Sequence, residues 1–131
     1  MAQKICEAKT PLVLECPTDN DEAFAAIHKM LLAERPDGIF ASVEKLAVVA
    51  YRVCEQMQLR IPEDIKIISF SNLQTAALLN PSLTTITQPA FEIGETAARE
   101  LLRIIKKKGS AKADVVLKSR LIERRSTGGE K

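Results

Sequence analysis

The stretch that decides the fold is residues 61–102, IPEDIKIISFSNLQTAALLNPSLTTITQPAFEIGETAARELL. After a proline turn, the short apolar run 65–70 predicts a strand that is buried on both faces. A short helix is predicted over 73–79, where an Asn-Pro pair ends it. A further strand is predicted at 84–87, and Pro89 takes the first-turn position that proline favours in the long helix that follows. Strand and helix therefore alternate through the stretch.

The same alternation continues on both sides of it. The other predicted elements are a strand at 11–16, a helix capped by the cluster 19–21 and running to 34, a strand at 39–41, a helix that Ser42 caps and that runs to 57, and a last extended piece at 115–117 and 121–122. Alternating strands and helices predict a parallel α/β sheet in a three-layer sandwich with right-handed crossovers.

Small polar residues follow the predicted strands at the points where the strands end. They are Ser42-Val43-Glu44 after one strand, Ser71-Asn72 after the next, and Gln88 after the third. Ligands of open parallel sheets bind beyond the carboxyl ends of the strands. The sequence therefore predicts a binding cleft at this edge, but it does not define the ligand.

Composition restricts the class of protein. The 131 residues are 46% hydrophobic and 27% charged, which suits one soluble domain or a piece of one. No apolar run approaches the roughly 20 residues that cross a bilayer, and no signal peptide is expected at Met1. The three cysteines (Cys6, Cys16 and Cys54) are too few and too unevenly spaced for a disulfide framework, and they fit a reducing cytosol.

The charge is uneven along the chain, with a net +7 in residues 99–131 and −5 in residues 1–98. A basic end is one mark of nucleic-acid binding. Here the dense run, Lys106-Lys107-Lys108, closes a helix that stops at Gly109, and cations are favoured at the carbonyl end of a helix dipole. This region has no aromatic residue for stacking on bases, so direct nucleic-acid binding is not predicted.

Evidence for catalysis is weak. Ser42-Val43-Glu44-Lys45 matches the S-x-x-K pattern of penicillin-recognising serine enzymes, but no S-D-N or K-T-G follows, and an N-cap serine explains it as well. The single histidine, His28, is predicted on the first helix, away from the strand ends. No P-loop, dinucleotide turn or metal-spaced Cys/His cluster is present. We predict no enzyme activity, no cofactor and no metal site, with a serine hydrolase as a remote alternative.

Several sequence blocks resemble one known family. They are Pro-Asp-Gly-Ile-Phe-Ala (36–41), Leu-Ala (46–47), Arg-Ile-Pro-Glu-Asp-Ile (60–65), Ile-Ser-Phe (68–70), Pro-Ser-Leu-Thr-Thr-Ile-Thr-Gln-Pro (81–89), Gly94 and Arg-Leu-Ile-Glu-Arg-Arg-Ser-Thr (120–127). In this order, over about residues 19–128, the chain resembles the C-terminal part of a bacterial transcriptional regulator of the lactose-repressor (LacI/GalR) family. That resemblance implies the type I periplasmic-binding-protein-like fold.

In that family a helix-turn-helix binds operator DNA, and a two-subdomain core binds a small effector, often a sugar or nucleobase. The resemblance implies a cytoplasmic, homodimeric regulator such as a repressor. It also implies that this chain is incomplete, because the helix-turn-helix, the N-terminal subdomain and the opening strand and helix of the C-terminal subdomain have no counterpart in it. By itself the chain is expected not to bind an operator.

The resemblance places the effector at Val43, Glu44, Ser71, Asn72 and Gln88. Four of these positions depart from the family, which usually has Asn-Asp at 43–44 and acids at 71 and 72. Val43 cannot hydrogen-bond through its side chain and Ser71 has no charge, whereas Gln88 matches the family's hinge glutamine. A neutral polyol or a nucleobase suits this set better than a phosphorylated sugar, because no Arg or Lys at these positions pairs an anion.

The resemblance also divides the chain. Residues 1–88 are expected to be part of the effector-binding subdomain, 89–110 a crossover helix that packs on the N-terminal subdomain, and 111–131 a returning strand and tail. The crossover helix carries a stripe of large apolar side chains, so the isolated chain is expected to be marginally stable or to associate.

A dimer face is implied at Val48, Leu78 and Leu79. Two consecutive leucines before a proline turn cannot both face one sheet, so at least one of Leu78 and Leu79 is expected to be exposed or paired. A second reading keeps the fold but makes the protein the sugar-binding component of a transport system. The residues upstream of Met1, a helix-turn-helix or a secretion signal, would discriminate the two.

Overall fold

The computed structural model describes residues 11–107 and 114–129. Its elements are α1 (Asn20–Glu34), β1 (Gly38–Ala41), α2 (Glu44–Gln56), β2 (Lys66–Phe70), the 3-10 helix η2 (Gln74–Leu78), β3 (Thr84–Thr87), α3 (Ala90–Lys107), β4 (Arg120–Ile122) and the 3-10 helix η3 (Arg125–Thr127). Cys6, Lys108 and Gly109, which entered the sequence predictions, lie outside the described residues.

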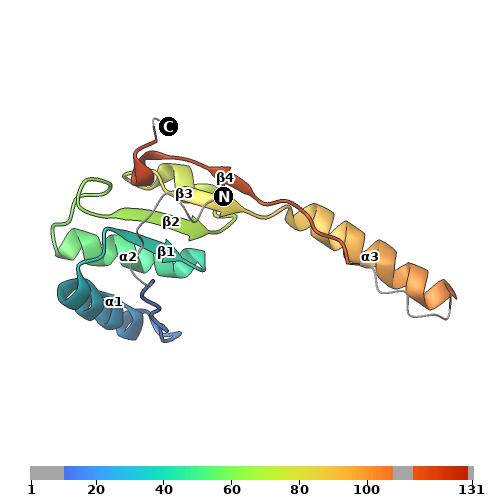
Figure 1. Cartoon of the computed structure of the whole chain (residues 1–131), viewed down its shortest axis with the longest axis horizontal. Helices are drawn as coiled ribbons and strands as arrows, with labels where there is room; N and C mark the ends of the chain where they lie inside the picture. The colour runs from blue at the N-terminus through green and yellow to red at the C-terminus, as the bar shows by residue number, and fades with distance from the viewer. Residues whose placement is uncertain (1–10, 108–113, 130–131) are drawn as a thin grey trace.

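The sheet has the order β1-β2-β3-β4 (Figure 1). β1, β2 and β3 are parallel, with Ile39 opposite Ile67 and Ile68 opposite Thr84. β4 runs antiparallel to β3, so the last extended piece closes the sheet in the opposite direction. The predicted α/β fold with a mostly parallel sheet is confirmed.

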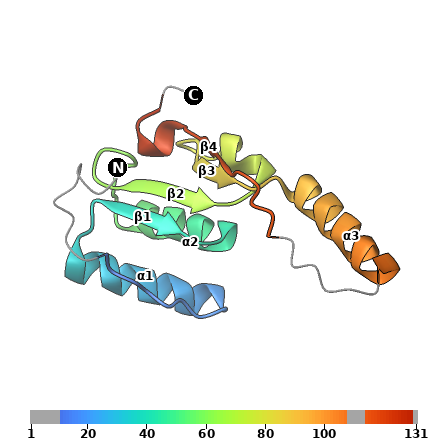
Figure 2. The same ribbon diagram turned by 45° about the vertical axis from the view of Figure 1, so that its right-hand side comes forward.

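The core lies between β1, β2 and the helices α1 and α2. α2 packs against both strands and α1 packs on α2 (Figures 1 and 2). Ala47, Ala50, Val53 and Cys54 of α2 are each fully buried, as is Ile67 in β2. The spacing of these α2 residues is that of one helix face, which explains why the sequence pattern located this helix correctly.

The opposite face of the sheet is open. Phe40 and Ile68 are partners across β1 and β2, and their side chains alternate with the core-facing Ile39 and Ile67. Phe40 is 60% exposed and Ile68 is only partly buried. The helices α1 and α2 therefore supply one covering layer, and they leave an apolar surface on the other side.

Two local predictions were wrong. Residues 11–16 form no strand, and Val13 within them is 86% exposed. An isolated strand has no partner for its backbone groups, and no described strand lies beside this segment. Ser42 does not cap α2 either, because the N-cap is Val43 and no side chain bonds the first turn. By contrast Asp19 caps α1, accepting from the amides of Asp21 at 2.8 Å and Glu22 at 3.1 Å.

α3 extends away from the sheet and from α1 and α2 (Figures 1 and 2), and Val115 and Leu117 line a hollow beside it. None of the principal packing contacts between described elements involves it. Phe91 is 81%, Leu101 58% and Ile105 63% exposed, although these are large apolar side chains. The predicted crossover segment is thus a helix. Its packing on an N-terminal subdomain and the predicted division of the chain stay predictions. No helix among the described residues is long and apolar enough to cross a membrane.

Candidate binding site at the carboxyl ends of the strands

Ser71 and Glu44 meet at the strand ends. Ser71 follows β2, and Glu44 is the first residue of α2, directly after the turn that leaves β1. The Ser71 hydroxyl donates to Oε2 of Glu44 at 2.9 Å and accepts from the amide of Leu73 at 2.8 Å. Ser71 is 6% exposed, whereas Glu44 is exposed. The pair therefore presents a solvent-facing carboxylate on a buried, fixed support.

Asn72 and Gln88 form the second contact. The Asn72 side-chain amide donates through Nδ2 to the Gln88 carbonyl at 3.0 Å, and its Oδ1 accepts from the Gln88 amide at 2.8 Å. The bonds use the main chain of Gln88, and its own side chain is left exposed. Sequence patterns placed both residues at this edge, but they carried no signal for this pairing.

The remaining predicted residue, Val43, is at the same edge. It is 49% exposed and occupies the N-cap position of α2, where its main chain is extended. The structure therefore brings Val43, Glu44, Ser71, Asn72 and Gln88 to the carboxyl ends of β1, β2 and β3. Their role in effector binding stays a prediction. Four of the five residues are exposed, so the group forms an open rim and not a closed cavity.

The groups that suggested catalysis are used elsewhere. The Lys45 ammonium donates to the main-chain carbonyl of Thr18, so it is directed toward the start of α1 and away from a reactive serine. His28 stacks on the Phe24 ring, with centroids 6.2 Å apart. Within residues 11–107 and 114–129, no group of three or more His, Cys, Asp or Glu side chains could hold a metal.

Ionisable groups with strongly shifted pKa values have structural contacts, both in the core and in a turn. Burial raises the pKa of the Cys54 thiol to about 11 and that of Tyr51 to about 12. The Tyr51 hydroxyl donates to the carbonyl of Pro81 at 2.9 Å, which ties α2 to the turn before β3. In the turn after α2, the Arg60 guanidinium bonds Asp64 and lowers the pKa of that carboxyl to about 2. All these groups keep one protonation state near neutral pH.

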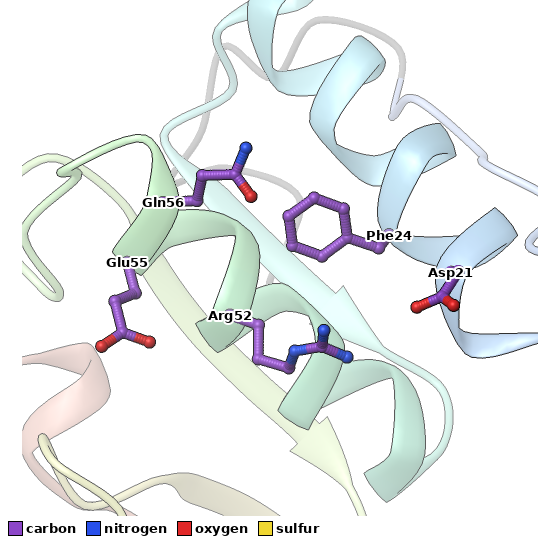
Figure 3. A pocket seen from close by; sticks show the side chains of 5 residues that line it. All are labelled: Asp21, Phe24, Arg52, Glu55 and Gln56. Atoms are coloured by element: carbon purple, nitrogen blue, oxygen red, sulfur yellow. The ribbon is translucent and has the colours of Figure 1, made fainter.

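A separate hollow of about 400 Å³ lies between α1 and α2. Figure 3 shows Phe24 of α1 directed toward α2, with Arg52 and Gln56 around it. The Arg52 guanidinium lies 5.5 Å from the centre of the Phe24 ring, a cation–π contact. Asp21 and Glu55 complete the lining. None of the strand-end residues contributes to this hollow, so it is distinct from the candidate site.

Comparison with protein families gives one match over most of the chain. The model of the periplasmic binding protein-like domain matches residues 2–127. The chain belongs to this family. Curated relatives include the HTH-type transcriptional repressor PurR of Photorhabdus laumondii, 33% identical over 126 residues, and that of Yersinia pestis, 31% identical over 125 residues. Each alignment covers 92% of this chain and 37% of the relative, so the chain spans little more than a third of their length.

Solved structures of similar fold include transcriptional regulators. A LacI family transcriptional regulator from Enterococcus faecalis, with bound ribose, is 34% identical with a TM-score of 0.75; the match covers 87% of this chain and 42% of that one. One from Bifidobacterium animalis subsp. lactis is 26% identical with a TM-score of 0.78 and the same coverage. The resemblance to LacI-family regulators is confirmed. These relatives are transcriptional regulators, and neither the transport nor the hydrolase alternative is favoured.

Proposed function

We propose that this chain is the effector-binding and dimerisation region of a cytoplasmic LacI-family repressor. The observation that carries the proposal is the meeting of Glu44, Ser71 and Gln88 at the carboxyl ends of three parallel strands, in a chain whose relatives are repressors. In this proposal residues 1–88 hold the effector, and α3 within 89–110 packs on an N-terminal subdomain. Residues 111–131 return to the sheet, and operator DNA is bound by a helix-turn-helix outside this chain.

The effector is proposed to be a neutral sugar, another polyol or a nucleobase. Glu44 offers a carboxylate that accepts hydrogen bonds from hydroxyl or amine groups, and the exposed Gln88 side chain both donates and accepts. None of the five predicted site residues is a cation, so none of them pairs a phosphate. The Enterococcus faecalis regulator binds ribose, and the CelR regulator forms a complex with cellobiose, which supports the neutral class.

The first prediction tests this site by calorimetric titration of the proposed repressor with neutral sugars, nucleobases and ribose 5-phosphate. A neutral compound is expected to bind at least about tenfold more tightly than ribose 5-phosphate. Ser71→Ala combined with Gln88→Ala is expected to weaken the tightest ligand about 10- to 100-fold, since each lost hydrogen bond is worth roughly 0.5–1.5 kcal/mol.

Gln74→Ala is the matched control, because Gln74 is an exposed amide in η2, three residues beyond Ser71. It is expected to leave affinity unchanged. Tight binding that survives the double substitution would show that the effector is held elsewhere.

The second prediction concerns the proposed dimer face. Val48 is 39% and Leu78 is 82% exposed, whereas Leu79 is partly buried and packs against the core. The expectation that at least one of the two leucines is exposed is confirmed. In the proposed repressor, Leu78→Asp is expected to halve the mass measured by sedimentation while the melting temperature stays within a few degrees, because little packing is lost.

Leu79→Asp serves as the comparison, since it places a carboxylate against the core and is expected to lower stability by several kcal/mol. A Leu78→Asp protein that still sediments as a dimer would remove Leu78 from the interface.

A further inference from the structure

Asn72 makes a paired contact that continues the sheet beyond its strands. β2 and β3 are in the register Phe70 opposite Ile86, and the amide of Ser71 donates to the Ile86 carbonyl at 3.0 Å. Two residues further along, the same register places Asn72 opposite Gln88. There the side-chain amide of Asn72 donates to the Gln88 carbonyl and accepts from the Gln88 amide, at 3.0 and 2.8 Å. The side chain therefore stands in for a peptide group of the strand pair.

Gln88 lies where α3 departs from the sheet. Its carbonyl also accepts from the amide of Ala90 at 2.9 Å, and α3 begins at Ala90. None of the principal packing contacts between described elements involves α3. The direction in which α3 leaves the sheet therefore depends on how Gln88 is held, and on the return of the chain at β4 (Figures 1 and 2).

The other neighbour of Asn72 is the binding rim. Ser71 precedes it in the chain, and the Ser71 hydroxyl is shared between Glu44 and the amide of Leu73. A molecule that accepts a hydrogen bond from the Ser71 hydroxyl, or donates one to Glu44, changes the hydrogen bonds of Ser71, which directly precedes Asn72. One three-residue turn thus holds the rim through Ser71 and the root of α3 through Asn72.

We infer that Asn72 is a positioning residue that links the Glu44–Ser71 rim to the start of α3 through its paired bonds with Gln88. The inference rests on the proposed function and deepens its regulation. Effector contact at the rim changes the hold on Gln88, and with it the orientation of α3. Asn72 then acts through Gln88, and its contribution to the regulator is separate from direct contact with the effector.

The test measures amide hydrogen exchange of the whole chain by NMR, without any ligand. Asn72→Ala removes the acceptor of the Gln88 amide, and exchange at Gln88 is expected to become about tenfold faster or more while the amides of β2 change little. Asn72→Asp keeps an acceptor for this amide but loses the donor to the carbonyl, so exchange at Gln88 is expected to stay slow. If the substitutions only destabilised the fold in general, amide exchange would become faster in both variants, and at the amides of β2 as much as at Gln88. Gln74→Ala is the control.

The link to the rim is tested by Ser71→Ala. Exchange at Gln88 is expected to become about threefold faster in the wild-type background and to change no further in the Asn72→Ala background. Unchanged exchange at Gln88 in Asn72→Ala or in Ser71→Ala would overturn the inference, and so would equal acceleration by Asn72→Asp and Asn72→Ala. Because no ligand is present, a failure to bind sugars or nucleobases refutes the proposed function and leaves this result standing.

Discussion

Ser126→Ala is expected to lower the free energy of unfolding of this chain by about 2–5 kcal/mol, because each buried main-chain group that loses its partner costs about 1–3 kcal/mol. The Ser126 hydroxyl is fully buried and lies between two strands. It donates to the carbonyl of Ile67 in β2 at 2.6 Å and accepts from the amide of Thr84 in β3 at 2.8 Å. Alanine leaves both main-chain groups without this partner.

Further hydrogen bonds from Arg124 join the segment around η3 to β3 and to the residue before it. The Arg124 guanidinium donates through Nη1 to the carbonyl of Leu83 at 2.7 Å, and the Arg124 amide donates to Oγ1 of Thr84 at 2.8 Å. Ser126→Ala therefore weakens the packing of η3 against β2 and β3.

Urea unfolding followed by circular dichroism measures the effect. Ser42→Ala is the matched control, because Ser42 is exposed and makes no cap bond to α2, so its change is expected within about 0.5 kcal/mol. A Ser126→Ala protein whose free energy of unfolding lies within about 1 kcal/mol of the wild type would show that other groups replace the hydroxyl.

The isolated chain is expected to associate at micromolar concentration through α3. Burying each large apolar side chain is worth roughly 1.5–3 kcal/mol, and Phe91, Leu101 and Ile105 are all more than half exposed. Replacing these three residues with lysine is expected to reduce the mass measured by light scattering at least about twofold, to that of a monomer, because exposed apolar patches drive association.

The control for added charge is Ala98→Lys combined with Glu92→Lys. It adds the same net charge at exposed positions of α3 and keeps the large apolar side chains. This variant is expected to associate like the wild type. A dilute monomer of the unmodified chain with a cooperative melt would instead mean that α3 is buried on the chain itself, and that residues 89–110 need no partner.

Much of the fold was predictable from local patterns. The apolar runs that became β1, β2 and β3 and the helix-period faces of α1 and α2 lie in the predicted order. Pattern locates such elements because a short continuous apolar run and a helix buried on one face have different hydrophobic periods. Parallel topology also places Glu44, Ser71 and Gln88 at one edge of the sheet, because each follows the carboxyl end of a strand.

The tertiary structure decided what those residues touch. Residues 11–16 have the composition of a strand but pair with no described strand. Consecutive Leu78 and Leu79 differ in burial, since Leu79 packs against the core and Leu78 is 82% exposed. The side chain of Asn72 binds the Gln88 main chain, and Ser126 reaches Ile67, a residue 59 positions away in sequence. Hydrophobic period is a property of neighbouring residues, so the sequence by itself determined the elements and their order. A hydrogen bond between distant segments depends on sheet register and on which backbone groups the packing leaves unpaired, and only the folded chain sets these.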